Sequence, residues 1–285
     1  MFALIIVSMS VNSEIVVTDD NDNVLIFKQP VERIVSLAPH VTELLFAAGA
    51  DKQILGTVSF SNYPEAAKKV SLIGNYDKID YEKILSLQPQ LVIYWGSGNP
   101  ASMINGVKNL KIKTFNSEPK SFEDVAVTIR ELGKLLGTEQ IAEKRVQLYL
   151  QRLSQLRKKY ANNKKKKIRV FYQVWNRPLM TINQKHLISE VIEFCGGINV
   201  FAELDSVAPT VDIESVIQKN PDVIIAGMAE GREDWLSSWK NWSSIAAVKH
   251  NHLYGIDADL IARHTPRILQ GTELMCDALN KVRNF

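Results

Sequence analysis

The sequence lacks any internal apolar run approaching the roughly 20 residues that a membrane-spanning helix requires, so no internal segment is predicted to cross a membrane. It also has little excess charge, because 34 Lys and Arg against 31 Asp and Glu leave a formal net charge of only +3. That charge is too small to argue for a nucleic-acid partner. An apolar content of 46% indicates an ordinary globular protein, and 285 residues fit two domains better than one.

The N-terminus carries the one apolar stretch that stands apart. Residues 2–11 resemble the hydrophobic region of a signal peptide, and a small-residue cleavage site would fit before Glu14. The basic residues that usually precede such a region are missing. Residues 1–13 are therefore interpreted as a truncated signal peptide, with a strand as the alternative, and we expect export without a lipid anchor.

Cysteine is scarce, with only Cys195 and Cys276. No CxxC pair and no Cys/His spacing of a zinc site occurs, which removes the usual sequence signatures of a redox or structural metal centre. An even number of cysteines in an exported chain points to one disulfide, which would stabilise the fold by roughly 4 kcal/mol. The alternative is two buried thiols in a reduced protein.

Motifs of common enzymes are also missing. There is no GxSxG, no phosphate-binding P-loop and no GxGxxG after a strand. The five histidines are scattered, although His40, His264 and Asp259 all follow predicted strands and could form a metal site. We expect no catalysis, no cofactor and no bound metal; a metal-dependent enzyme on a two-lobed scaffold remains the alternative.

What the sequence does contain is one pattern that it uses twice. Asp80, Glu82, Pro89 and the apolar run 91–94 recur at the same offsets as Asp212, Glu214, Pro221 and 223–226. Each copy predicts a short capped helix, a proline stop and a buried strand. A weaker echo relates residues 43–49 to residues 190–196, each running from a glutamate to a glycine.

This repetition predicts an α/β protein of two similar, Rossmann-like lobes that face each other across a ligand cleft. Residues 138–160 carry one apolar stripe without a turn signal, which predicts a helix about 30 Å long that spans both lobes. We therefore divide the chain into a first lobe (14–137), a backbone helix (138–163) and a second lobe (164–285). A rigid helix between lobes predicts only a small hinge motion.

Ligands of open α/β sheets bind beyond the carboxyl ends of the strands. The residues predicted there are mostly aromatic and nearly uncharged: Pro39, His40, Phe60, Tyr63, Tyr76, Trp95, Trp175, Met180, Asp259 and Arg263. Such a set suits a large, flat, partly apolar ligand that is held by stacking and a few hydrogen bonds. The alternative is that several of these aromatics belong to the cores of the lobes.

Glu82 and Glu214 occupy matching positions in the first turn of the repeated helix. One interpretation is that each carboxylate complements its helix dipole, worth about 0.3–1 kcal/mol. The other is that two similar lobes present a matched pair of carboxylates to a partner with two-fold symmetry.

Five segments of the chain resemble the helical-backbone substrate-binding proteins of ABC importers. They are 33–43 (RIVSLAPHVTE), 46–49 (FAAG), 61–64 (SNYP), 89–93 (PQLVI) and 195–199 (CGGIN). The resemblance covers about residues 32–283. Within that family, the branch that binds vitamin B12 is favoured by 91–99 (LVIYWGSGN), by the two cysteines, and by Asp259, Arg263, Pro266 and Arg267.

The resemblance implies a periplasmic protein, expected to be a monomer, that holds a corrinoid between its lobes and delivers it to an ABC importer. It implies ligand contacts at Phe60, Tyr76, Trp95 and Asp259, and docking of Glu82 and Glu214 on arginines of the permease dimer, so that its contact with the membrane complex is peripheral.

The chain departs from the family pattern in the second lobe. An expected aromatic is replaced by Met180, for which Trp175 could substitute, and an expected tryptophan is replaced by Ala208.

The alternative ligands are haem and ferric siderophores. Haem would need an axial Tyr or His, for which Tyr63, Tyr76 and His40 are candidates. A catecholate siderophore would need clustered arginines, for which only Arg177 and Arg263 are suitably placed.

Overall fold

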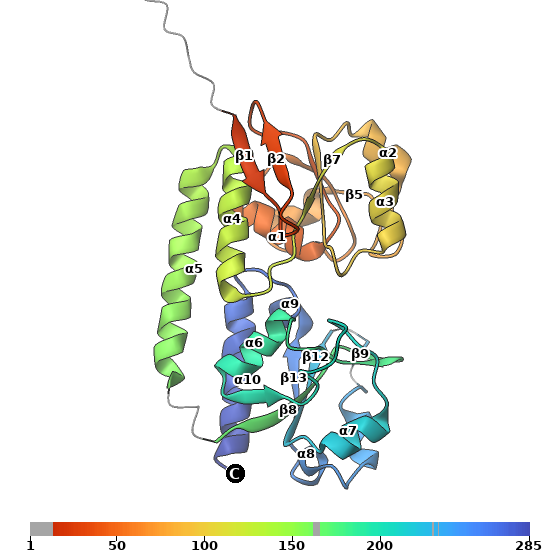
Figure 1. The fold of residues 1–285 in the computed structure, drawn as a ribbon, viewed down its shortest axis with the longest axis vertical. Helices are drawn as coiled ribbons and strands as arrows, with labels where there is room; N and C mark the ends of the chain where they lie inside the picture. The colour runs from red at the N-terminus through yellow and green to blue at the C-terminus, as the bar shows by residue number, and fades with distance from the viewer. Residues whose placement is uncertain (1–13, 162–165, 230, 233) are drawn as a thin grey trace, which may run out of the picture.

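The computed structural model describes residues 14–161, 166–229, 231–232 and 234–285. The predicted signal peptide at 1–13 and the predicted boundary at 163/164 lie outside the described residues. Figure 1 shows two α/β lobes stacked along the long axis, each built on its own sheet. The predicted fold class is therefore confirmed, while the division of the chain at 137/138 stays a prediction.

The first lobe begins with an antiparallel hairpin of β1 (Ile15–Thr18) and β2 (Val24–Phe27). Its parallel sheet has the order β5-β4-β3-β6-β7. The strands are β3 (Ile34–Ser36), β4 (Ile54–Thr57), β5 (Ser71–Leu72), β6 (Leu91–Tyr94) and β7 (Lys113–Asn116). The helices are α1 (Pro39–Ala48), α2 (Tyr81–Ser86), α3 (Ala101–Asn109) and α4 (Phe122–Leu136), with the 3₁₀ turn η1 (Glu65–Lys69).

The second lobe has a parallel sheet of order β11-β8-β12-β13. Its strands are β8 (Ile168–Gln173), β11 (Gly197–Asn199), β12 (Val223–Met228) and β13 (Leu253–Asp257), and β9 (Trp175–Asn176) pairs with β10 (Leu179–Met180) in a small hairpin. The helices are α6 (Leu187–Phe194), α7 (Ile213–Lys219), α8 (Ala246–Lys249), α9 (Ala258–Ile261) and α10 (Ile268–Arg283), with the 3₁₀ turn η3 (Ser237–Asn241).

The repeated sequence is a repeated structure. Helix α2 and strand β6 of the first lobe correspond to α7 and β12 of the second. Both helices begin in the same way, because Asp80 accepts a hydrogen bond from the Lys83 N–H at 2.9 Å and Asp212 accepts one from the Ser215 N–H at 2.7 Å. Each carboxylate satisfies an amide that no helical carbonyl can reach, which is why an aspartate opens both copies.

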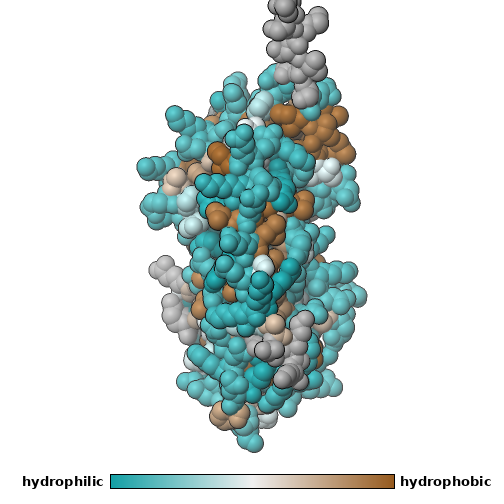
Figure 2. All heavy atoms as spheres, turned by 90° about the vertical axis from the view of Figure 1, so that its left-hand side faces the viewer, coloured by the Kyte–Doolittle hydropathy of each residue, from teal (hydrophilic) through white to brown (hydrophobic). Residues whose placement is uncertain are grey.

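The predicted long helix is confirmed as α5 (Glu139–Lys159), a single run of 21 residues. It lies beside α4 and extends alongside the second lobe (Figure 1), where Glu273 of α10 pairs with Arg152 at 2.5 Å and with Lys159 at 2.8 Å. Figure 2 shows that the outer face over α5 is largely hydrophilic. Within the described ranges, none of the helices is both long and apolar enough to cross a membrane.

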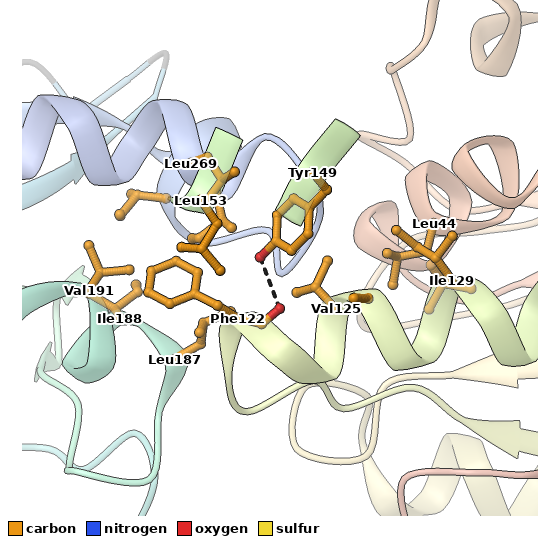
Figure 3. Close-up of a cluster of buried hydrophobic side chains, with 14 of the residues drawn as sticks. Leu44, Phe122, Val125, Ile129, Tyr149, Leu153, Leu187, Ile188, Val191 and Leu269 are labelled. Atoms are coloured by element: carbon orange, nitrogen blue, oxygen red, sulfur yellow. Dashed lines mark hydrogen bonds between the residues drawn. The ribbon is translucent and has the colours of Figure 1, made fainter. Parts of the chain in front are cut away.

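One hydrophobic cluster joins the two lobes. Phe122 of α4 and Leu153 of α5 lie in the same buried cluster as residues of α6 and α10, including Ile188 and Leu269, as Figure 3 shows. The Tyr149 hydroxyl donates a hydrogen bond to the carbonyl of Phe122 at 3.0 Å. Because the lobes share a close-packed core along this side, rotation about it would separate apolar surfaces. This agrees with the expected small hinge motion, which stays a prediction.

The predicted disulfide is confirmed between Cys195, at the end of α6, and Cys276 in α10. The two cysteines are separated by 81 residues and are fully buried, so the bond ties the last helix to the first helix of the second lobe.

Replacing both Cys195 and Cys276 by alanine is expected to lower the free energy of unfolding by about 2–5 kcal/mol, because the crosslink restricts the unfolded chain. Guanidinium unfolding, with and without a reductant, measures the loss. The reductant should lower the wild-type midpoint and leave that of the double variant unchanged. A wild-type midpoint that is insensitive to complete reduction would contradict the prediction.

Candidate functional site

The carboxyl ends of both sheets face the junction between the lobes. Loops that follow strands of the first lobe contact the segment that follows β13 of the second lobe. The ring centroids of His40 and His264 are 6.3 Å apart, as are those of Trp95 and His264. We call this region the inter-lobe surface and define it by residues 38–40, 59–64, 95–99, 116–119, 174–181 and 257–267.

Glu43 of α1 holds the lobes together at this surface. Its side chain is only 2% exposed and accepts hydrogen bonds from Arg263 at 2.8 Å and from Arg267 at 2.6 and 3.0 Å. The Thr265 hydroxyl donates a further bond at 3.0 Å. A buried carboxylate tolerates burial only when it is paired and hydrogen-bonded, and all of its partners here belong to the opposite lobe.

Arg263 also contacts the loop that follows β4. Its guanidinium also donates to the Phe60 carbonyl at 2.9 Å, to the Asn62 side-chain oxygen at 2.8 Å and to Asp259 at 2.6 Å. Arg263 is predicted as a ligand contact, but its side chain is only 8% exposed and its donors are used by the protein. Its role as a ligand contact stays a prediction.

Phe60 is the aromatic that this network presents. Its ring is 72% exposed, and its backbone has a φ of +67°, in the left-handed region. A bulky residue in that region costs on the order of 1–3 kcal/mol and persists only where surrounding bonds impose it. The hydrogen bond from Arg263 to the Phe60 carbonyl is such a bond.

Trp95, which follows β6, is half-buried and held in a fixed orientation. Its indole N–H donates to Glu118 at 3.1 Å, and Glu118 also accepts bonds from the backbone and hydroxyl of Ser97, each at 2.7 Å. A Cβ added at Gly98 would overlap the indole, so only glycine leaves room for the ring there. The sequence does not predict Glu118 as a site residue, because Trp95, which it orients, lies 23 positions away in the chain.

In the second lobe the structure brings Trp175 and Met180 opposite each other across the β9–β10 hairpin. Trp175 is 42% exposed and meets Trp235 edge-on with ring centroids 5.4 Å apart. The guanidinium of Arg232 lies 5.0 Å from the Trp175 ring and 4.6 Å from the Trp235 ring. Arg232 and Trp235 are not predicted as site residues from the sequence, since nothing in their spacing relates them to the hairpin.

The remaining candidates are placed differently. Asp259 is half-buried, with one carboxylate oxygen bonded to Arg263 and the other 3.4 Å from the Asn62 amide nitrogen. Tyr76 is 67% exposed in the turn that the Gly74–Ile79 bridge closes. Its role as a ligand contact stays a prediction.

Three histidines from both lobes meet below Trp95. Burial lowers the pKa of His40 to about 3 and lowers the pKa values of His186 and His264 as well. The rings of His186 and His264 are 5.0 Å apart, edge to face. Over the described part of the chain, no group of three or more His, Cys, Asp or Glu side chains is arranged to hold a metal ion, so the His40, His264 and Asp259 hypothesis has no geometric support.

Of the three residues predicted as haem ligands, His40 is already engaged. His40 is buried, and its Nε2 lies 3.2 Å from the Ser117 carbonyl. The ring of Tyr63 is covered by the Arg267 guanidinium at 4.1 Å. Tyr63 is nevertheless 46% exposed, and Tyr76 is 67% exposed.

A cavity of about 430 Å³ lies between the first hairpin and α4 and shares only Glu118 with the inter-lobe surface. Its lining is rich in carboxylates, including Asp20, Asp22 and Glu131. Such a lining offers no aromatic face, so this cavity does not suit the flat, apolar ligand that the sequence predicts.

Comparisons with known proteins agree on one family. A family model described as periplasmic binding protein matches residues 34–260. The vitamin B12-binding protein of Vibrio cholerae serotype O1 is 35% identical over 254 residues, covering 88% of this chain and 90% of that protein. The vitamin B12-binding protein of Vibrio vulnificus is 37% identical over 249 residues, covering 87% of this chain and 90% of its own.

Solved structures show the same likeness. The crystal structure of the periplasmic vitamin B12 binding protein BtuF of Vibrio cholerae superposes with a TM-score of 0.82 at 35% identity, covering 90% of this chain and 99% of that one. The periplasmic heme-binding protein BhuT, in complex with two hemes, has a TM-score of 0.76 at 18% identity, covering 88% of this chain and 98% of its own. At that identity the second likeness concerns the fold alone.

The buried histidines make the stability depend on pH. Because their folded-state pKa values lie below the usual 6.5, the unfolded chain binds protons first, and the free energy of unfolding falls as the pH drops below 6.5. Burial raises the pKa of Glu190 to about 7 and that of Asp20 to about 6, so these two carboxyls act in the opposite sense. Since the histidines outnumber them, we expect a net loss of stability between pH 6.5 and 5.

Substituting His264→Asn is expected to reduce the slope of the free energy of unfolding against pH by up to about 1.4 kcal/mol per pH unit, which corresponds to one proton. Glu190→Gln should make it steeper, because it removes an opposing group. Denaturant unfolding at a series of pH values from 5 to 7.5 measures the slope. Equal slopes for the wild type and both variants would refute the assignment.

Proposed function

The chain belongs to the periplasmic binding protein family, and from that membership we propose that it captures a corrinoid, vitamin B12, in the periplasm and delivers it to an ABC importer. The observation that carries the proposal is the likeness to vitamin B12-binding proteins over nearly nine-tenths of the chain. The family is one of binding proteins, in line with the prediction that the chain is not an enzyme.

Capture would take place at the inter-lobe surface. Phe60 and Trp95 from the first lobe and Trp175 from the second would pack on the corrin, and Asp259 would accept hydrogen bonds from its amide periphery. What supports this is that hydrogen bonds hold the backbone of Phe60 and the indole of Trp95 in place in the free protein. Side chains that are already ordered lose little freedom on binding, so more of the contact energy appears as affinity.

The second lobe would contribute fewer stacking groups than the family pattern implies. Arg232 lies over the rings of Trp175 and Trp235, so that this arginine and the exposed Trp175 would form the wall opposite Phe60. Met180 stands where the family pattern has an aromatic residue. We infer that Trp175 supplies the stacking that this aromatic would have given.

Haem and ferric siderophores are the less favoured ligands. One of the three candidate haem ligands, His40, is buried and bonded to the protein, and the likeness to a haem-binding protein is at only 18% identity. A catecholate siderophore would need free arginines, and the donors of Arg263 already bond to Glu43, Phe60, Asn62 and Asp259.

Hand-off would use the outer face that carries α2 and α7. Figure 1 shows these helices on the same side of the molecule, one in each lobe. Glu82 and Glu214 are exposed in their first turns, two positions after the capping aspartates. We propose that each carboxylate enters an arginine pocket of one permease subunit, and that the protein docks as a monomer. Export would depend on residues 1–13 as a signal peptide.

Titration of the purified mature protein with cyanocobalamin, followed by calorimetry and tryptophan fluorescence, tests the ligand. We expect saturable one-to-one binding. Trp95→Ala should weaken it at least tenfold, because the lost ring removes its buried apolar area and, in addition, stacking of about 0.5–1.5 kcal/mol. Gly98→Ala should also weaken it, by displacing the indole. If cyanocobalamin gave neither heat nor quenching, the ligand would be reassigned to haem. A Soret band on mixing the protein with haemin would then identify haem as the ligand.

The double variant Glu82→Ala/Glu214→Ala is expected to bind cyanocobalamin as the wild type does but to associate at least tenfold more weakly with the importer in nanodiscs. Loss of a charge-assisted pair at each subunit is the reason. Glu139→Ala is the matched control, because Glu139 also lies exposed in a first helical turn, that of α5. If the double variant associated with the importer as the wild type does, the docking assignment would be wrong.

A further inference from the structure

We propose that Asn62 is a positioning residue for ligand capture, which locks Phe60 of the first lobe and Asp259 of the second into one rigid binding edge. This inference deepens the proposed function and rests on it for the identity of the ligand. Nothing in the sequence marks Asn62 for this role; the contacts across the lobes do.

The side chain of Asn62 bonds in both directions across the junction. Its oxygen accepts a hydrogen bond from Arg263 at 2.8 Å, and its nitrogen lies 3.4 Å from Asp259 Oδ2. An amide both donates and accepts, whereas a carboxylate at this position would accept only. The two partners fix the orientation of the amide, since the arginine can only donate and the aspartate can only accept.

The backbone of the same residue supports Phe60. The Asn62 N–H donates to the Phe60 carbonyl at 2.9 Å, and Arg263 donates to that same carbonyl at 2.9 Å. Arg263 thus binds both the Phe60 backbone and the Asn62 side chain. The left-handed backbone of Phe60 is held by one bond from its own loop and one from the opposite lobe, and the residue is 72% exposed.

Asp259 is left with acceptor capacity next to this ring. Its Oδ1 atom bonds to Arg263 at 2.6 Å, while the contact of Oδ2 within the described residues is the long one to Asn62. A carboxylate oxygen accepts more than one bond, so Oδ2 can receive an N–H from a ligand. The edge therefore suits a ligand in which an amide donor lies beside a flat apolar face, as at the periphery of a corrin ring.

A double-mutant cycle tests whether Asn62 acts through Phe60. Calorimetric titration with cyanocobalamin would compare the wild type, Asn62→Ala, Phe60→Ala and the combined variant. We expect Asn62→Ala to weaken binding about tenfold in the wild-type background, the equivalent of about 1.4 kcal/mol. In the Phe60→Ala background the same change should weaken binding less than threefold, because the ring it positions is gone.

Companion variants separate positioning from general stability. Arg263→Lys keeps the charge but loses the fork of donors, so it should reproduce the loss of affinity. Asn62→Asp keeps the acceptor for Arg263 while repelling Asp259, and should fall between the wild type and Asn62→Ala. Asn105→Ala, at an exposed asparagine of α3, is the matched control and should bind as the wild type does.

A readout without ligand distinguishes this proposal from the proposed function. Hydrogen exchange of the segment 58–64 in the free protein should be faster in Asn62→Ala than in the wild type. If the wild type fails to bind cyanocobalamin but this exchange accelerates, the ligand assignment fails and the positioning role stands. If Asn62→Ala weakens binding equally in both backgrounds, or leaves exchange and affinity unchanged, the positioning role is overturned.

Discussion

The buried carboxylate of Glu43 is the contact on which the arrangement of the two lobes depends. Two arginines and a threonine of the second lobe converge on it, so the charge of a helix in one lobe is neutralised only by the other. Removing one partner of such a buried group commonly costs 3–5 kcal/mol, because the remaining charges stay buried without compensation. The relative position of the lobes is thereby set by directional bonds as well as by the shared hydrophobic core along α4, α5, α6 and α10.

The second lobe makes the reciprocal contact with its own glutamate. Glu190 of α6 accepts a hydrogen bond at 2.9 Å from the N–H of Phe122, at the start of α4 in the first lobe. The sequence echo between 43–49 and 190–196 therefore has a structural meaning, because each copy sends a carboxylate to the opposite lobe. The two differ in environment: Glu43 is surrounded by arginines, whereas burial raises the pKa of Glu190 to about 7.

These contacts bear directly on ligand capture. Arg263 belongs both to the Glu43 cluster and to the network that holds Phe60, Asn62 and Asp259, so that the bonds which fix the lobes also orient the proposed binding residues. Trp95 is oriented separately, by Glu118 and by the space above Gly98. A surface ordered in this way binds a rigid ligand without first having to arrange its own side chains.

The features that are local or repeated could be predicted from the amino-acid sequence: the two lobes, the long helix, the capping aspartates with Glu82 and Glu214 in the turns they open, and, from the cysteine count, the disulfide. Hydrophobic periodicity, helix capping and proline stops act over a few residues, so they can be recognised in the amino-acid sequence. Only the tertiary structure decided that Arg263 is a cross-lobe clamp, that Glu118 holds Trp95 and that Asn62 meets Asp259. The last contact joins residues 197 positions apart. Such pairs form only when the lobes meet, and no periodicity along the chain encodes which loop will face which.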